Sequence, residues 1–294
     1  MDAARAMLAI ARDVAPNAWC VQADLEALPF RRGSLGGSWA RASYLHVRRD
    51  RLPWALAGLH QVLAVDAPAA FTFRVGRNEG AIPGDDFPGR FFAEWEVEPL
   101  RDVLIGAGFA ISHLAHDGDE WVTVHASRAR TLPDFVGPEM RMLVCGLNPS
   151  VYAADVGVGF ARPGNRFWPA ALAAGLVSRD RDPAHALQKH GIGMTDLCKR
   201  ATRSADALSK SDYQEGVARV ERLVSWLRPA AVCFVGFAGW RAAVDPKAKP
   251  GEQPIHFGGT RTYVMPNPSG LNTHHTSADL AEHLRAALAL AEQA

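Results

Sequence analysis

The chain has 294 residues, of which 48% are hydrophobic and 21% charged, and its net charge at pH 7 is +1. This length allows two ordinary domains, and the composition is typical of a soluble globular protein. No apolar run approaches the roughly 18–20 residues that span a bilayer, and the N-terminus has no signal-peptide core. We therefore expect a cytoplasmic protein without a membrane partner. The four cysteines form no CxxC pair, so no metal site is expected.

Charge is distributed unevenly along the chain. Residues 1–140 carry 14 basic and 18 acidic side chains, whereas residues 141–294 carry 18 basic and 13 acidic ones. A mildly basic second half is weak support for a polyanionic partner of that half.

The first 125 residues alternate between strand-like and helix-like segments. Apolar and β-branched residues predict strands within 18–30, 37–47 and 67–76, and a strand pair at 110–116 and 120–126. Helical spacing predicts helices over 52–64 and 97–109. This first domain, residues 1–125, is therefore expected to be α/β. Residues 126–141, with two prolines, a glycine and mixed charge, are expected to form a linker.

The second domain, residues 142–294, has a clearer pattern. Continuous apolar runs predict strands at 142–147, 191–197, 230–237 and 260–266, and helical spacing predicts helices at 166–177, 213–228 and 278–293. Strands without polar alternation, separated by helices, indicate a parallel sheet that is covered on both faces. Ligands bind such sheets beyond the carboxyl ends of their strands.

Two of these strands end in the same tripeptide. Asn148 begins an Asn-Pro-Ser turn after the first strand, and Asn267 begins another after the last. Between them, the glycine- and proline-rich segment 159–168 carries Phe160 and the amide side chain of Asn165. An aromatic face near amide side chains suits a planar heterocycle, which needs a surface to stack on and an edge to hydrogen-bond. Each of these residues alone fits an ordinary turn or core position, so the hypothesis depends on their joint occurrence.

Four segments in this order resemble the mismatch-specific uracil-DNA glycosylase family, the bacterial relatives of thymine-DNA glycosylase. They are GLNPS (146–150), GFARPGNRFW (159–168), GIGMTDL (191–197) and MPNPSGLN (265–272), and the resemblance covers about residues 131–294. It implies an α/β/α sandwich with a short parallel sheet. It also implies a monofunctional DNA glycosylase that removes uracil, and related damaged or mismatched pyrimidines, opposite guanine. The implied partner is double-stranded DNA that contains such a base, bound by a monomer that needs no cofactor.

The resemblance also implies roles for individual residues. Asn148 would be catalytic, because a neutral amide can orient a water molecule while backbone N–H groups stabilise the departing base. The flipped base would be bound by Gly146, Leu147, Phe160 and Asn267. The group that enters the DNA stack or reads the widowed guanine would be Ser269, Gly270, Leu271 and Asn272, with Leu271 as the wedge. The candidate phosphate contacts are Arg166, Lys199 and Arg200.

The first 125 residues resemble the later part of a class I S-adenosylmethionine-dependent methyltransferase. The matching segments are 22–30, 33–47, 59–73 and 89–109, and Asp24 matches the residue that approaches the adenine. The family's first strand and glycine-rich turn are missing, and Gly36 and Gly37 stand where an acidic residue is expected. We therefore expect an incomplete Rossmann-like segment without methyltransferase activity, either because the protein starts further upstream or because this half serves as a scaffold.

Two other functions remain open at this point. One is a methyltransferase whose glycosylase-like half targets DNA. The other is a non-catalytic protein that binds mismatches without cleaving them.

Overall fold

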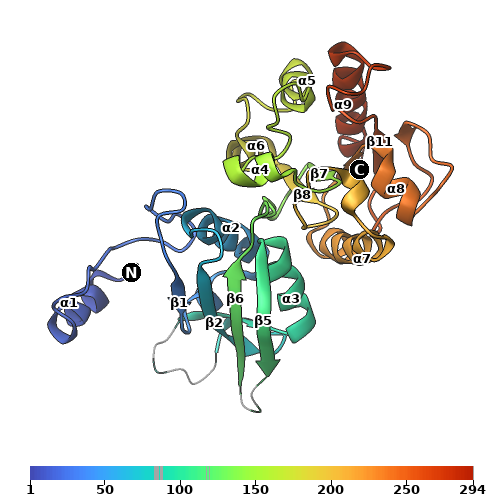
Figure 1. Cartoon of the computed structure of the whole chain (residues 1–294). Coiled ribbons are helices and arrows are strands. Elements are labelled where there is room, and N and C mark those ends of the chain that lie inside the picture. The colour runs from blue at the N-terminus through green and yellow to red at the C-terminus, as the bar shows by residue number, and fades with distance from the viewer. Residues whose placement is uncertain (83–85, 87–88, 117, 119, 294) are drawn as a thin grey trace. The chain divides into compact units, whose positions relative to one another are not determined.

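The structure is a computed structural model that describes residues 1–82, 86, 89–116, 118 and 120–293 (Figure 1). The chain divides into two compact units. The first consists of Met1–Arg101 and Phe109–Arg128, and the second of Asp102–Gly108 and Ala129–Ala294. Each unit contains its own sheet, so the expected α/β fold class is confirmed. None of the described helices combines the length and the apolar composition that a membrane-spanning segment requires.

The first unit is built around one mixed sheet. Its strands are β1 (Ser38–Ala40), β2 (Pro68–Val75), β3 (Glu79–Ala81), β4 (Phe91–Trp95), β5 (Phe109–His116) and β6 (Trp121–Arg128). Their order is β3-β4-β2-β6-β5, and β1 also pairs with β2. On one side β2 is parallel to β1 and β4, and on the other it is antiparallel to β6. This arrangement fits the incomplete Rossmann-like unit that the sequence predicts.

Three helices and two short 3-10 turns accompany this sheet. They are α1 (Arg5–Val14), η1 (Tyr44–His46), η2 (Arg49–Arg51), α2 (Leu52–Val62) and α3 (Val97–Gly106). The strand predicted within 18–30 does not form. Only isolated bridges, Asp2 with Gln22 and Asp24 with Ala27, occur there, and Trp19 is almost fully exposed. A strand needs a continuous partner for its backbone groups, and this segment has none among the described residues.

The second unit contains a five-stranded sheet. Its strands are β7 (Met142–Gly146), β8 (Ile192–Asp196), β9 (Ala231–Val235), β10 (Gly251–Glu252) and β11 (Thr262–Met265). They lie in the order β10-β11-β9-β7-β8, and all pairs are parallel except β10 with β11. Every residue of β7, β9 and β11 is buried, as the continuous apolar runs predict.

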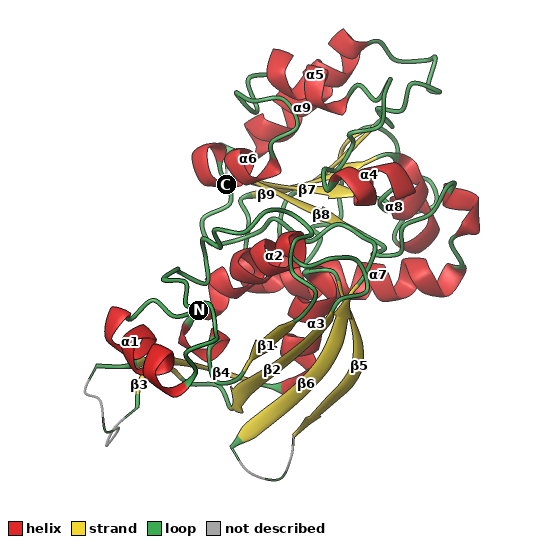
Figure 2. Ribbon diagram, turned by 60° about the vertical axis from the view of Figure 1, so that its left-hand side comes forward, coloured by secondary structure: helices red, strands yellow, loops and turns green. Residues whose placement is uncertain are grey.

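Helices cover both faces of this sheet. They are α4 (Val151–Val156), α5 (Phe167–Ala173), α6 (Pro183–His190), α7 (Lys210–Leu227), α8 (Phe237–Ala243) and α9 (Ser277–Ala291), with a 3-10 turn η3 at Ala205–Ala207. Val224 of α7 and Trp240 of α8 share a core with alternate residues of β7 and β9. On the opposite face, Tyr263 of β11 hydrogen-bonds to His283 of α9. Figure 2 shows the sheet between α9 and α7, which is the expected α/β/α sandwich.

Segment 126–141, expected as the linker, contains the boundary between the two units, and most of it is packed into them. Its first three residues belong to β6, and residues 131–137 are buried. Phe135 forms a bridge with Met194, so this segment covers the outer edge of β8. Pro133 and Gly137, which indicate a linker in the sequence, therefore lie in a buried, irregular segment that covers the edge strand, whereas Pro138 is exposed.

Candidate active site

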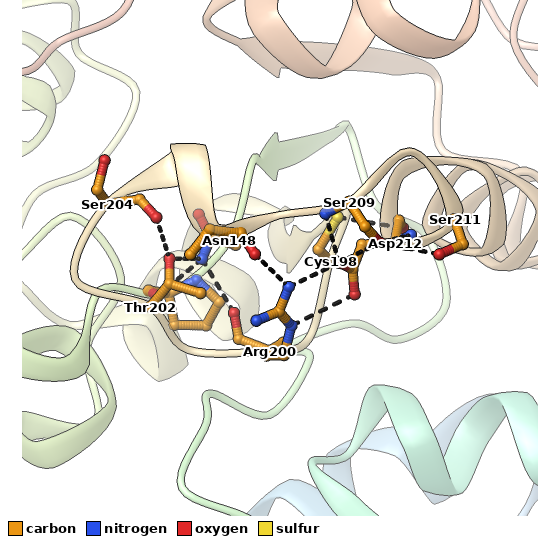
Figure 3. Close-up of polar contacts among 10 residues, drawn as sticks. Asn148, Cys198, Arg200, Thr202, Ser204, Ser209, Ser211 and Asp212 are labelled. Carbon is orange, nitrogen blue, oxygen red and sulfur yellow. Dashed lines mark hydrogen bonds and ion pairs between the residues drawn. The ribbon is translucent and has the colours of Figure 1, made fainter.

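The Asn148 turn follows β7 directly and is held by its own side chains. Ser150 caps α4, because its hydroxyl accepts a hydrogen bond from the Ala153 N–H. The Asn148 amide nitrogen donates to the Arg200 carbonyl (2.9 Å) and to Thr202 Oγ1 (2.8 Å). Figure 3 shows the Asn148 side chain between these two partners.

These partners fix the orientation of the Asn148 amide. The Thr202 hydroxyl donates its proton to the Ser204 carbonyl, so its oxygen can only accept from Asn148. The Arg200 carbonyl can also only accept. The amide nitrogen must therefore face these groups, and Oδ1 must face the other way. Within the described part of the chain no donor reaches Oδ1, which leaves its lone pairs available to a water molecule.

The segment after β8 holds this turn in place. Cys198 N donates to the Leu147 carbonyl (2.8 Å), and Thr202 N donates to the Pro149 carbonyl (3.1 Å). The 198–202 segment thus runs beside the Asn148 turn and pairs with it through main-chain and side-chain bonds. The turn is consequently preorganised, which reduces the cost of positioning a reactant.

A second polar group lies at the end of the neighbouring strand. Gly146 of β7 pairs with Asp196 of β8. An ideal Cβ built on Gly146 would lie 2.6 Å from Asp196 Oδ1 and 3.2 Å from the Phe160 ring. The carboxylate and the aromatic edge therefore meet over the bare backbone of Gly146. Sequence reasoning gave Asp196 no role, although it ends a buried parallel strand in the same way as Asn148 follows one.

Asp196 has an unusual acidity. Burial raises the pKa of its carboxyl group from 3.8 to about 6, with nearby Asp134 adding to the rise and Lys199 and Arg219 opposing it. A carboxylate with a pKa near neutrality can accept a proton and release it again at physiological pH. Raised carboxyl pKa values of this kind are concentrated at functional sites.

A buried ion cluster supports Asp196 from behind. Asp134 accepts hydrogen bonds from Lys199 Nζ (2.8 Å), Arg219 Nη1 (2.7 Å) and Thr195 Oγ1 (2.7 Å). Burial alone would raise the pKa of Asp134, but the two cations outweigh it and the pKa is lowered. Arg219 also donates to the main-chain carbonyl of Asp196 (2.8 Å). The cluster therefore fixes the backbone from which the Asp196 side chain extends.

Phe160 occupies a strained position on the loop after α4. Its φ angle is +57°, a left-handed conformation that aromatic residues rarely adopt. Its ring stacks on Phe167, with centroids 4.3 Å apart and planes at 24°, and Trp168 Nε1 anchors the loop through the Gly159 carbonyl (2.8 Å). Such strain costs on the order of 1–3 kcal/mol and persists where the surroundings enforce it. The surroundings here hold an aromatic ring over the end of β7.

The second Asn-Pro-Ser turn is also stiffened by its own amides. Asn267 Oδ1 accepts from Ser269 N (2.9 Å), and the Asn272 amide donates to the Asn267 carbonyl (2.8 Å). Asn267 lies beside Gly236 at the end of β9, since an ideal Cβ on that glycine would be 3.5 Å from Asn267 Cβ. At the tip of the turn, Leu271 is 88% exposed. The apolar side chain thus extends into solvent from a rigid loop.

The Phe160 loop and the Leu271 loop touch each other. Arg166 N donates to the Pro268 carbonyl (2.9 Å), and an ideal Cβ on Gly270 would lie 2.8 Å from the Gly164 carbonyl oxygen. Because the Phe160 ring also contacts Gly146, segment 159–166 connects both Asn-Pro-Ser turns. The turns therefore lie at the same carboxyl edge of one sheet.

The three candidate phosphate contacts all have partners within the protein. The Arg166 guanidinium donates to the carbonyls of Ser269, Asn272 and His275, so it braces the Leu271 loop. Lys199 is only 10% exposed and pairs with Asp134, which leaves little of its ammonium group accessible, and its phosphate contact stays a prediction. Arg200 binds Asp212 and the Ala207 carbonyl but stays half exposed, and its phosphate contact remains a prediction.

Leu147 contributes differently from the other proposed base contacts. Its side chain packs in the core beside Gly239 and Leu197, since an ideal Cβ on Gly239 would lie 3.0 Å from Leu147 and 2.8 Å from Leu197. The Leu147 side chain is only partly buried there. No group of three or more potential metal-ligating side chains gathers anywhere among the described residues.

Comparison with known proteins identifies the family of the second unit, which contains this edge of the sheet. The model of the uracil DNA glycosylase superfamily matches residues 133–291, more than half of the chain and nearly all of the second unit. The chain belongs to the uracil DNA glycosylase superfamily. Its function is accordingly DNA glycosylase-like, and the two Asn-Pro-Ser turns, Phe160 and Asp196 all lie within the matched region.

Solved structures of methyltransferases are similar to a smaller part of the chain. An S-adenosylmethionine dependent methyltransferase from Mesorhizobium loti is 19% identical, with 43% of this chain and 77% of that chain covered and a TM-score of 0.35. A SAM-dependent methyltransferase from Methanosarcina mazei is 11% identical, with 44% and 80% covered and a TM-score of 0.37.

Proposed function

We propose that the protein is a monofunctional DNA glycosylase that hydrolyses the N-glycosidic bond of uracil, and of related damaged or mismatched pyrimidines, opposite guanine in double-stranded DNA. The observation that carries this proposal is the fixed orientation of the Asn148 amide. Its nitrogen is held by Arg200 and Thr202, so its oxygen faces away from these two groups, at the carboxyl edge of the sheet. Superfamily membership supports the same reaction class.

The reaction needs a water molecule, a leaving base and an acceptor for one proton. As the bond between the base and sugar C1′ breaks, its electron pair leaves with the base and the sugar becomes oxocarbenium-like. The water oxygen bonds to C1′, and the water loses a proton. Asn148 Oδ1 would orient this water, and the Asp196 carboxylate would accept the proton. The base leaves as an anion and takes a proton from solvent, while Asp196 returns its proton to solvent, so the products are a free pyrimidine and an abasic site.

Phe160 and Leu271 would bring the base to these groups. A base inside a duplex must rotate out of the stack before a side chain can reach its glycosidic bond. The Phe160 ring supplies a face for stacking, and the exposed Leu271 would fill the gap in the stack. The bracing by Arg166, Asn267 and Asn272 supports this role, because a wedge that is already rigid loses little entropy on insertion.

Single-turnover release of uracil from a labelled G·U duplex tests the proposal. The wild type should release uracil, and Asn148→Ala should slow release by about 100-fold or more. Asn148→Asp should also be slow, because its carboxylate would face the Arg200 carbonyl instead of donating to it. Asn17→Ala, which changes an exposed asparagine of the first unit, serves as the matched control and should leave the rate unchanged.

The outcomes separate the competing functions. Wild-type protein that binds the G·U duplex without releasing uracil would be a mismatch-binding protein, and the proposed enzyme would be rejected. Equal rates for wild type and Asn148→Ala would keep the enzyme but remove the role of Asn148. Comparing G·U, A·U and G·T duplexes would then rank the substrates.

A further inference from the structure

The two loops at the carboxyl edge of the sheet enclose a hollow beside the wedge. It has a volume of about 270 Å³, and its lining residues are Arg162, Pro163, Asn165, Ser269, Gly270 and Leu271. The close approach of Gly164 to Gly270 and the bond from Arg166 N to Pro268 join its two walls. The hollow is therefore a fixed feature of the surface, built from the same two loops that carry Phe160 and Leu271.

The charge in this hollow comes from one side chain. Arg162 is exposed, and no hydrogen bond or ion pair reaches its guanidinium within the described part of the chain. None of the lining residues is acidic. Arg166, four positions later, has its guanidinium occupied by three loop carbonyls. An uncompensated cation thus stands next to an exposed apolar wedge.

A cation beside an apolar wedge suits a DNA strand, which has stacked bases and a charged sugar–phosphate backbone. A wedge that enters the stack brings the sugar–phosphate chain of that strand against the adjoining loop wall. A guanidinium binds phosphate oxygens with two parallel hydrogen bonds, and such contacts fix the register of a protein on a duplex. The other cations near the site are less available, because Lys199 is buried with Asp134 and Arg200 is held by Asp212.

We propose that Arg162 binds a backbone phosphate of the DNA strand beside the Leu271 wedge. This inference rests on the proposed function and adds to it a contact that positions the duplex. Arg162 acts in binding, not in bond cleavage. The contact is independent of base sequence, because phosphates are the same at every step of the strand.

The salt dependence of binding tests this contact. The probe is a G·U duplex whose uridine carries a 2′-fluoro group, which makes the glycosidic bond resistant to cleavage, and affinity is measured by fluorescence anisotropy from about 50 to 200 mM salt. Arg162→Gln should weaken binding about 3- to 10-fold at the lowest salt. It should also reduce the slope of log K against log salt by about 0.9, the value of one B-DNA phosphate. Arg162→Lys should keep most of the slope.

Arg141→Gln is the matched control, since it removes the same charge at the amino edge of the same sheet, directly before β7. It should leave the slope unchanged. An unchanged slope in Arg162→Gln, in protein that melts like the wild type, would overturn the inference. A loss confined to duplexes with guanine opposite the lesion would also overturn it, because Arg162 would then read a base. Absence of wild-type binding to any duplex would instead reject the proposed function.

Discussion

The Asp196 carboxylate lies against Gly146, the last residue of the neighbouring strand. The parallel register of β7 and β8 places the two residues side by side, and an ideal Cβ on Gly146 would be 2.6 Å from Asp196 Oδ1. Only glycine leaves room for the carboxylate and the Phe160 ring at this point. The geometry of the site therefore depends on a missing side chain as much as on the groups present.

Gly146→Ala should inactivate the protein while leaving its fold intact. The added methyl group would displace Asp196 or Phe160, and a shift of about 1 Å at such a site costs on the order of 100-fold in rate. Overpacking should also lower the free energy of unfolding by about 1–3 kcal/mol. Single-turnover uracil release and urea unfolding measure the two effects. In the control Gly159→Ala, the nearest atom to the new Cβ is Leu132 Cδ1 at 3.7 Å, so its activity should stay close to wild type.

The rate of base release should depend on pH through Asp196. Since burial raises the pKa of this group to about 6, its carboxylate form increases as pH rises through that value. The single-turnover rate should increase about tenfold per pH unit below pH 6 and level off above it, because only the carboxylate can accept a proton. Asp196→Asn should be slower and should lack this rise. A wild-type rate that is flat between pH 5 and pH 8 would contradict the role of Asp196.

The same substitution should make the protein more stable at neutral pH. The folded-state pKa of Asp196 lies above its unfolded value, so the folded state favours the protonated form, and stability falls as pH rises from about 4 to about 6. Asp196→Asn removes this penalty. The variant should be more stable than wild type by on the order of 1–3 kcal/mol at pH 8, and the difference should vanish near pH 4. Urea unfolding at both pH values measures this difference. A less stable variant at pH 8 would show that burial of the Asp196 carboxylate does not destabilise the fold.

From the sequence, the position of the site in the fold could be predicted better than the set of residues that form it. Continuous apolar runs placed the ends of β7 and β11 at one edge of a parallel sheet, which brought Asn148 and Leu271 into one region. The Thr202 hydroxyl that orients Asn148 comes from a segment over fifty residues away, and no local pattern reports such a contact. Asp196 could have been identified in the same way as Asn148, since it too lies at the carboxyl end of a buried parallel strand.

Charged side chains were the least predictable part of the site. The local sequence around a basic loop residue does not show whether its side chain faces solvent or the protein's own carbonyl groups. Lys199 pairs with Asp134, which lies in the segment expected to be the linker. Arg162 lies within the motif 159–168, and only the fold shows that its charge is left uncompensated. Such assignments depend on three-dimensional partners.

Arg166 should control the rigidity of the wedge loop and, through it, DNA binding. Its guanidinium bridges the carbonyls of Ser269, Asn272 and His275, a planar arrangement that a lysine ammonium cannot reproduce. Arg166→Lys should therefore increase deuterium uptake of the 268–276 peptide several-fold, by lowering the local opening free energy by about 1–3 kcal/mol. It should also weaken binding of the cleavage-resistant G·U duplex, because the wedge must then be ordered on insertion. Arg162→Gln is the matched control: it removes a cation from the same loop but none of these hydrogen bonds, so its deuterium uptake should equal that of the wild type. Equal uptake in Arg166→Lys and wild type would mean that the Asn267 and Asn272 bonds alone hold Leu271 in place.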